Sequence, residues 1–243
     1  MKKALYIGLD IGGSKIRGVL WDGKGKRVAM AAEIATPATK RAFISHHASL
    51  IARLFRKRPG RIRGVGIGVA GLINGTRVIH SPNISYLQRF DLKQALPMPV
   101  PLRVDNDARA FARAEAKLGR GRRSRRMLAF TIGTGIGRAY VEKGRVRTIR
   151  RFEHAEEWER RYQHIRDQRD DAALAAFLGE KLAPIIQRHR PDVVILGGGV
   201  LGRRGFTSQL TTNLRASGVK ANIIRGRLGP NAAAIGAALL FGG

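Results

Sequence analysis

Cysteine is absent from the 243 residues of this chain, and acidic residues are scarce. Without thiols the chain can form no disulfide, use no cysteine nucleophile and hold no metal through thiolates. Zinc could be bound only by histidine and carboxylate side chains. Long apolar runs are lacking as well, so the sequence predicts neither a signal peptide nor a membrane-spanning helix. We therefore expect a soluble, cytoplasmic protein with no membrane partner.

The scarcity of acidic residues leaves a large excess of positive charge. The chain has 46 Lys and Arg residues against 17 Asp and Glu, a formal net charge of +29. Such a surface attracts polyanions. Two interpretations stay open: a solvated surface typical of an Arg-rich or salt-adapted proteome, or a surface that binds nucleic acid, polyphosphate or an acidic membrane. The apolar fraction of 44% predicts a folded chain of one large or two small domains.

Apolar periodicity predicts an ordered series of strands and helices. In the first half these are strands at 4–9, 16–21 and 27–34 with a hairpin turn at 22–25, a helix at 39–57, a strand at 62–69, a short helix at 91–95, a strand at 102–104 and a helix at 108–118. In the second half they are strands at 127–132, 139–142 and 145–148, a helix at 170–189, a strand at 193–196, a helix opened by residues 197–199, a strand at 221–224 and a helix at 231–241.

One unit occurs twice in this series. The segments LYIGLDIGGSKIRGVLWDGKG at 5–25 and LAFTIGTGIGRAYVEKG at 128–144 each contain a strand, a glycine turn, a second strand and a hairpin. Strands followed by helices in two successive rounds predict an α/β protein. We expect two similar lobes with a central cleft between them.

Three glycine-rich turns follow predicted strands, at Asp10–Ser14, Gly133–Gly137 and Gly197–Gly199. Glycine lets backbone N–H groups approach an anion closely, and successive N–H groups form anion-binding nests. Each turn taken alone is also explained by the steric needs of a tight connection. None fits the P-loop pattern, and the first two lead into strands, which the dinucleotide-binding fingerprint does not allow.

Two carboxylates are the candidate chemical groups. Asp10 ends the first strand, where open α/β sheets place ligand chemistry, although it could instead cap the glycine turn. Asp107 directly precedes a predicted helix and could be its N-cap, or could accept a proton from a substrate hydroxyl. We expect Glu115, on the same helix, to be solvated or ion-paired.

Five motifs, in this order, resemble the ROK family of sugar kinases and repressors within the hexokinase, actin and Hsp70 superfamily. They are LDIGGSKIRGVLWD at 9–22, DNDARAFARAEAKLGRG at 105–121, FTIGTGIGRAYVEKGRV at 130–146, PDVVILGGGV at 191–200 and LGPNAAAIGAALL at 228–240. The resemblance implies two ribonuclease H-like lobes, as in actin-like ATPases. The small N-terminal lobe would comprise 1–105, with the closing helix 230–243 packing back on it, and the large lobe 106–229.

The resemblance also implies a kinase that phosphorylates a hexose hydroxyl, similar to glucokinase. Asp107 would be its general base, and Asn106 would hold the sugar. Asp10 would organise Mg²⁺ through water. The donor would be admitted by Gly12, Gly13 and Ser14 and bound on its nucleotide side by Thr134, Gly135, Gly198 and Gly199. The segments GVAGLI at 68–73 and SPNI at 81–84 match regions that contact the hexose, which makes Gly71 and Asn83 candidates, although Asn83 could equally be a turn residue after proline.

The segment after the second glycine turn departs from the family pattern. Many members carry Glu-x-Gly-His followed by a cysteine-rich zinc motif, and without cysteine no zinc site is expected here. The shorter, zinc-free branch similar to polyphosphate glucokinases fits better. Its Glu-Phe-Gly-His aligns with Arg151-Phe152-Glu153-His154, so His154 would contact the sugar, and either Glu153 replaces the missing Glu or sugar recognition has changed. A second register puts Glu156 at the Glu position, and His154 could also be a surface ion-pair residue.

The resemblance leaves the donor and one rival function open. ATP is the usual donor of the family, but the positive charge and the zinc-free branch favour inorganic polyphosphate as well, guided by the loop Arg120–Arg126. Repressors of the family have an N-terminal helix-turn-helix domain that this chain lacks, so we expect no specific DNA binding. Arg151 in place of Glu leaves a non-catalytic sugar sensor as the alternative. Because members of the family usually dimerise, the resemblance implies a homodimer.

Overall fold

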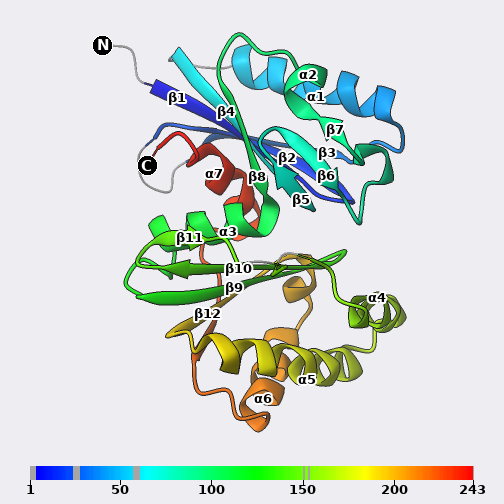
Figure 1. Cartoon of the computed structure of the whole chain (residues 1–243), viewed down its shortest axis with the longest axis vertical. Helices are drawn as coiled ribbons and strands as arrows, with labels where there is room; N and C mark the ends of the chain where they lie inside the picture. The colour runs from blue at the N-terminus through cyan, green and yellow to red at the C-terminus, as the bar shows by residue number, and fades with distance from the viewer. Residues whose placement is uncertain (1–3, 24–27, 57–60, 150, 153, 243) are drawn as a thin grey trace. The chain divides into compact units, whose positions relative to one another are not determined.

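The computed structural model describes residues 4–23, 28–56, 61–149, 151–152 and 154–242 (Figure 1). They form two compact units, one of residues 1–114 with 231–243 and the other of residues 115–230. The division lies within helix α3 (Asp107–Lys117), all of which the sequence analysis assigns to the second lobe. Within the described ranges, no helix has both the length and the apolar character needed to cross a membrane.

The first unit is built on a five-stranded sheet. Its strands lie in the order β3 (Val28–Ala35), β2 (Lys15–Trp21), β1 (Ala4–Ile11), β4 (Arg61–Val69) and β8 (Leu102–Asn106). The first three are antiparallel, and β1, β4 and β8 are parallel. The predicted third strand is confirmed from Val28 onward. Residues 24 and 25 of the predicted hairpin turn, Arg27 at the start of the predicted strand, Lys57 at the end of the predicted helix, and Glu153 lie outside the described residues.

The second unit repeats this sheet. Its order is β11 (Arg145–Arg147), β10 (Ile136–Glu142), β9 (Arg126–Ile132), β12 (Val193–Gly197) and β13 (Asn222–Arg225). The pairs on the β11 side are antiparallel and those on the β13 side parallel, as in the first unit. The α/β class and the internal repeat predicted from the two glycine-turn segments are therefore confirmed.

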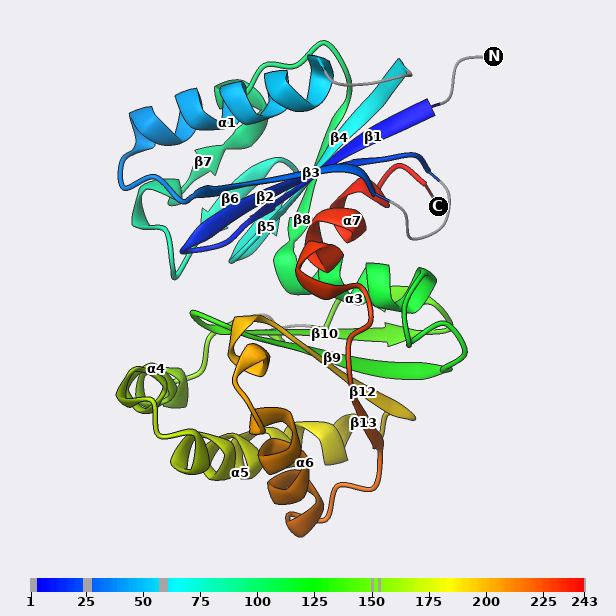
Figure 2. The ribbon, with the colours of Figure 1, turned by 180° about the vertical axis from the view of Figure 1, so that it is seen from behind.

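Alternation along the strands decides which helix covers each face of the first sheet. The side chains of Leu5, Ile7, Leu9 and Ile11 join a core with residues of α1 (Lys40–Arg56). The other face carries Gly8 on β1 and the alternate glycines 64, 66 and 68 on β4. Helix α7 (Ala232–Ala238) packs on this glycine face, visible in Figure 2, and a Cβ on Gly8 or Gly66 would clash with its backbone carbonyls.

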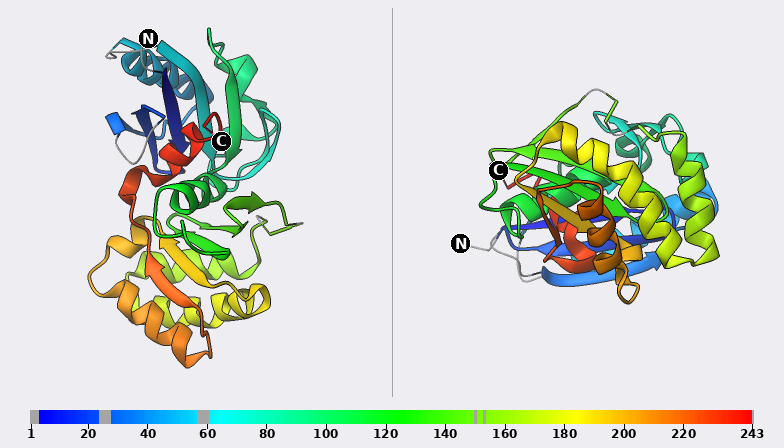
Figure 3. Two further views of the ribbon diagram at one scale, coloured as in Figure 1. Left: turned by 90° about the vertical axis from the view of Figure 1, so that its left-hand side faces the viewer. Right: turned by 90° about the horizontal axis from the view of Figure 1, so that it is seen from below.

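Two long helices cover the second sheet. Helices α5 (Asp171–His189) and α6 (Phe206–Ala216), whose ribbons Figure 3 shows from two sides, contribute apolar side chains every four residues to one core. This core contains Leu128, Phe130 and Ile132, the alternate residues of β9. The second unit thus has an apolar core of its own, built on the repeated sheet.

Several elements differ from the sequence predictions. One small sheet was not predicted, because its strands are too short to show alternation; they are β5 (Leu72–Asn74), β6 (Arg77–His80) and β7 (Phe90–Asp91). The short helix α2 (Leu92–Ala95) that follows this sheet was predicted. Helix α4 (Trp158–Gln168) was not predicted. The run Gly197–Gly199 leads into a short 3-10 helix at Gly199–Gly202 rather than into α6.

Glu115 corrects a further expectation. Its side chain is fully buried rather than solvated. Its carboxylate accepts hydrogen bonds from the backbone N–H groups of Arg120 and Leu228, at 3.0 and 2.9 Å. Glu115 therefore anchors both the arginine-rich loop and the segment that leads out of the second unit.

Candidate functional site

Asp10 and Asp107 lie on the glycine face of the first sheet. Asp10 is near the end of β1, where it pairs with Gly68 of β4, and Gly68 in turn pairs with Asp105 of β8. Asp107 is the first residue of α3, directly after β8. A Cβ on Gly68 would lie 3.5 Å from the Asp107 Cα and 3.2 Å from the Ala110 Cβ. The missing side chain at Gly68 therefore lets α3 begin close to the sheet, and brings the two predicted carboxylates into one region.

The two carboxylates interact electrostatically. The pKa of Asp10 is raised from 3.8 to about 7, chiefly by burial and next by the negative charge of Asp107, while the Arg17 guanidinium opposes both. Arg17 lies opposite Asp10 in the β1–β2 register and pairs with Glu33 at 2.6 Å. The sequence analysis did not identify Arg17, nor the role of Gly68 in letting α3 approach the sheet. The strand pairing of the hairpin could have indicated Arg17, because it puts Arg17 opposite Asp10.

This pair fits a divalent cation. A buried carboxyl beside a second carboxylate is costly to ionise, and a divalent cation removes that cost. Mg²⁺ keeps several of its waters and takes only one or two carboxylates, so a site with few protein ligands suits it. Asp10 is the residue that would hold it, as the sequence analysis predicts.

Asn106, which lies next to Asp107 in the chain, stabilises the local structure through two hydrogen bonds. Its Oδ1 accepts the backbone N–H of Arg109 at 3.1 Å, which caps α3, and its Nδ2 donates to the Gly71 carbonyl at 3.0 Å. The capping role considered for Asp107 is therefore filled by Asn106. Gly71 has φ of +135°, and a Cβ there would clash with the His80 carbonyl. The predicted sugar-binding residues Asn106 and Gly71 thus lie in hydrogen-bond contact.

The other predicted residues of the first unit lie on its loops. Gly12 donates its N–H to the Lys15 carbonyl at 3.0 Å and accepts the Thr36 hydroxyl at 2.6 Å, which closes the first glycine turn. Gly13 is half-buried and Ser14 exposed. Asn83 is half-buried between β6 and the 3-10 turn Ser85–Leu87.

In the second unit the turn between β9 and β10 holds Thr134 and Gly135, both half-buried. The Gly133 N–H donates to the Gly135 carbonyl at 3.0 Å. Gly198 follows β12 with φ of +99°, and a Cβ there would clash with Ile132, so this turn packs directly on the end of β9. Gly199 opens the 3-10 helix. The second and third glycine turns are therefore neighbours.

The segment after β11 holds the residues that depart from the family pattern. Arg151 adopts φ of +61°, and its carbonyl accepts the His154 N–H at 3.2 Å. His154 is exposed, and Glu153 lies outside the described residues. Glu156 forms an ion pair with Arg138 and accepts the Trp158 indole N–H at 2.8 Å. Glu156 therefore holds the start of α4.

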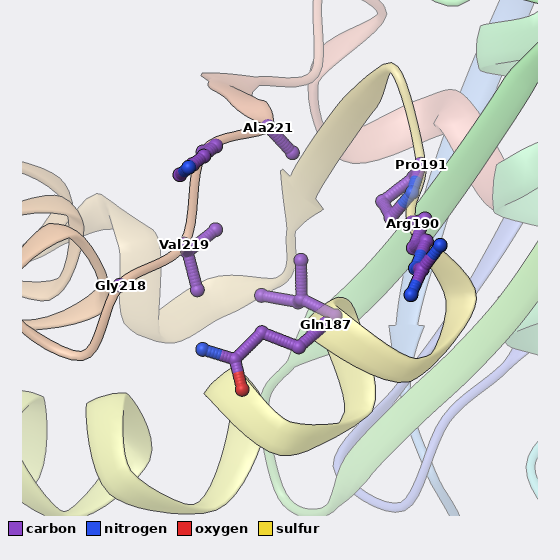
Figure 4. Close-up of a pocket in the computed structure, with 8 residues that line it drawn as sticks. Gln187, Arg190, Pro191, Gly218, Val219 and Ala221 are labelled. Atoms are coloured by element: carbon purple, nitrogen blue, oxygen red, sulfur yellow. The ribbon is translucent and has the colours of Figure 1, made fainter.

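A pocket of about 420 Å³ lies elsewhere in the second unit, where α5 ends and β12 and β13 begin (Figure 4). Its lining residues are Ile186, Gln187, Arg190, Pro191, Gly218, Val219, Lys220 and Ala221. None of the residues predicted from the sequence is among them. Because parallel strands carry ligand chemistry at their carboxyl ends, this pocket is at the wrong edge of the sheet for the predicted site.

Comparison with known proteins identifies the chain's relatives. The model of the ROK family matches residues 6–156. The glucokinase of Streptomyces coelicolor is 36% identical over 149 residues, which cover 59% of this chain and 45% of that protein. The chain thus spans less than half the length of this curated relative in the match.

Solved structures match over almost the whole chain. The inorganic polyphosphate/ATP-glucomannokinase of Arthrobacter sp. strain KM has a TM-score of 0.86 at 26% identity, and the match covers 98% of this chain and 98% of that one. The ROK family glucokinase of Streptomyces griseus, in complex with glucose and AMPPNP, has a TM-score of 0.84 at 23% identity, with 97% of this chain and 98% of that one covered. The fold is therefore that of the ROK sugar kinases, within the actin-like ATPases.

Proposed function

Because this chain belongs to the ROK family, we propose that it is a sugar kinase that transfers a phosphoryl group from ATP to a hydroxyl of a hexose. Glucose is the first sugar to test, since the Streptomyces coelicolor relative is a glucokinase and the Streptomyces griseus neighbour binds glucose. The single observation that carries the proposal is the approach of Asp10 and Asp107 on the glycine face of the first unit.

The residues of the first unit would divide the work. Phosphoryl transfer needs a donor held in line, neutralised charge and a base near the attacking hydroxyl. Asp107 would accept the proton of the sugar hydroxyl, while Asn106 and Asn83 would orient the sugar beside it. Asp10 would hold Mg²⁺ through water, and the bound cation supplies charge neutralisation at the phosphates. Arg17 would keep Asp10 oriented toward this region.

Residues of the second unit would bind the donor. The glycine turns with Thr134, Gly135, Gly198 and Gly199 offer backbone N–H groups to phosphates, and glycine at these positions lets the nucleotide approach closely. His154, with Glu153, would contribute to sugar recognition from the loop after β11. Whether Arg151, at the position of the family Glu, changes the preferred sugar is answered by assaying a panel of hexoses and N-acetylhexosamines.

Asp107→Asn tests the proposed base. We expect kcat with glucose, ATP and Mg²⁺ to fall by about 10² to 10⁴, because the neutral amide cannot accept the proton. Glucose binding measured by calorimetry should persist, and the circular dichroism spectrum should be unchanged. Full activity of this variant would contradict the assignment. A wild-type chain that binds glucose but transfers no phosphoryl group would favour the alternative, a sugar sensor.

Inorganic polyphosphate is a second candidate donor. The net charge of +29 and the likeness to the polyphosphate/ATP-glucomannokinase both favour it. The exposed residues Arg122, Arg123 and Arg125, in the loop anchored by Glu115, offer a cationic path to a chain of phosphates. A homodimer, implied by the resemblance, and a cytoplasmic location, expected from the lack of long apolar runs, stay predictions, and light scattering would test the dimer.

A further inference from the structure

Three residues on one face of α4 contact the turn that joins β9 to β10. Glu159, Tyr162 and Arg166 are spaced by three and four residues, so they lie on one side of the helix. The Glu159 carboxylate accepts the backbone N–H of Ile136. The Tyr162 hydroxyl donates to the Gly133 carbonyl at 2.6 Å. Nη1 of Arg166 donates to the carbonyls of Gly133, at 3.2 Å, and Thr134. The helix thus holds the turn at three points.

The side chains that make these contacts are largely shielded from water, which strengthens their hydrogen bonds. Tyr162 is fully buried, and burial raises its pKa to about 12, so its hydroxyl stays protonated and donates at any working pH. The Arg166 side chain is only 17% exposed and also pairs with Asp167 at 2.8 Å. A charged donor to a backbone carbonyl in such surroundings forms one of the stronger hydrogen bonds in proteins.

The contacts determine where the turn's N–H groups point. In a planar trans peptide the C=O and the N–H point in opposite directions. The carbonyls of Gly133 and Thr134 point to α4, so the N–H groups of Thr134 and Gly135, which belong to the same two peptide units, point away from it. Two successive N–H groups on one side form the beginning of an anion-binding nest. The carbonyl oxygens, which would repel a phosphate, are drawn to the opposite side.

Arg166 is itself connected to the third glycine turn. Nη2 of Arg203 donates to the Arg166 carbonyl at 3.1 Å, and Nη1 of Arg203 pairs with Asp171 at 2.6 Å. Arg203 follows directly on the 3-10 helix Gly199–Gly202. The corner between α4 and α5 (Asp171–His189) therefore links both glycine turns of the second unit.

From these contacts we propose that Arg166 is a positioning residue for the phosphoryl donor, assisted by Tyr162. It acts by holding the carbonyls of Gly133 and Thr134, and so presents the N–H groups of this turn to the donor phosphates. The inference rests on the proposed kinase function and extends it to a helix that no motif of the family resemblance included.

The test compares Arg166→Gln with Arg160→Gln. Arg160 is exposed on the same helix, and its position in the sequence puts it off the face that carries Glu159, Tyr162 and Arg166, so its variant removes the same charge and leaves Arg166 in place. We expect Arg166→Gln to raise the KM for ATP about tenfold and to weaken AMPPNP binding equally, because a charged hydrogen bond is lost. The KM for glucose should not change. Tyr162→Phe, which keeps the packing, should give a smaller change in the same direction.

Amide hydrogen exchange supplies a readout independent of activity. The amides of residues 133–137 should exchange faster in Arg166→Gln than in the wild type and in Arg160→Gln. Equal exchange rates, or an ATP KM no higher than that of Arg160→Gln, would overturn the proposal. A wild-type chain that neither turns over nor binds AMPPNP would count against the kinase function, whereas the exchange rates would still decide whether Arg166 holds the turn.

Discussion

Asp10 lies on the glycine face of the first sheet with Gly68 between it and the start of α3. Burial and the charge of Asp107 together raise its pKa to about 7. The unfolded chain loses this proton near pH 3.8, and the folded chain holds it until about pH 7. The folded state therefore loses stability as the pH rises between these values. Such a cost is typical of a residue kept for its chemistry rather than for the fold.

Removing the Asp10 carboxylate should stabilise the ligand-free chain. At pH 7.5 in EDTA, Asp10→Asn is expected to raise the free energy of unfolding by roughly 2 to 4 kcal/mol, because a neutral amide avoids ionisation in a buried, negative environment. Millimolar Mg²⁺ should raise the melting temperature of the wild type but not of this variant. Glu180→Gln, on an exposed surface, is the control. An Asp10→Asn chain less stable than the wild type in EDTA would contradict the predicted effect.

Helix α1 contains a buried histidine, His47, among its core residues. His47 is fully buried, its Nδ1 donates to the Phe43 carbonyl at 2.9 Å, and its ring centroid lies 3.9 Å from that of Phe43. Within the described part of the chain its Nε2 has no hydrogen-bond partner. Burial lowers the pKa of His47 to about 4. The native packing of the helix therefore favours the neutral imidazole.

This histidine predicts acid sensitivity of the first unit. Between pH 6.5 and 4 the unfolded chain binds a proton at His47 that the folded chain does not, so stability falls as the pH falls. From pH 7.5 to 4.5 the loss should be about 2 kcal/mol. Urea unfolding at both pH values should show that His47→Gln removes this part of the loss, while His46→Gln on the exposed face retains it. An equal pH dependence in both variants would show that His47 is not responsible.

Elements whose residues alternate or repeat clearly were predicted, and those without such a pattern were not. The apolar residues of 62–69 predicted β4 as a strand, but only the packing of α7 explains why one face of that strand carries glycine at 64, 66 and 68. Helix α4 consists mostly of charged and polar residues, so its three large apolar side chains, Trp158, Tyr162 and Ile165, are easily overlooked although their spacing is that of one helix face. Its position is determined by hydrogen bonds to a turn about 30 residues earlier in the chain, which no local pattern can indicate.

The charge of the whole molecule belongs to no single element. Net charge acts through the summed field, which concentrates polyanions near the surface and weakens as salt is added. If this field guides inorganic polyphosphate, its use as a donor must depend on ionic strength more steeply than the use of ATP, which carries fewer charges.

A donor assay tests this dependence. With glucose and Mg²⁺, the KM for polyphosphate should rise between about 50 and 200 mM salt far more than the KM for ATP. Arg122→Gln combined with Arg123→Gln should raise the KM for polyphosphate and leave that for ATP unchanged. Arg160→Gln with Arg204→Gln removes the same charge from exposed positions elsewhere in the second unit. No transfer from polyphosphate at low salt would exclude it as a donor.

The sequence by itself determined the α/β class, the repeated strand–glycine turn unit, the family resemblance and the two candidate carboxylates. These depend on local periodicity and on short motifs, which are present in the order of the residues. Tertiary structure decided what depends on contacts between distant segments: the raised pKa of Asp10, the capping of α3 by Asn106, the burial of Glu115 and the hold of Arg166 on the second glycine turn. Desolvation and hydrogen-bond geometry arise only when the chain has folded, so no pattern along the sequence could have supplied them.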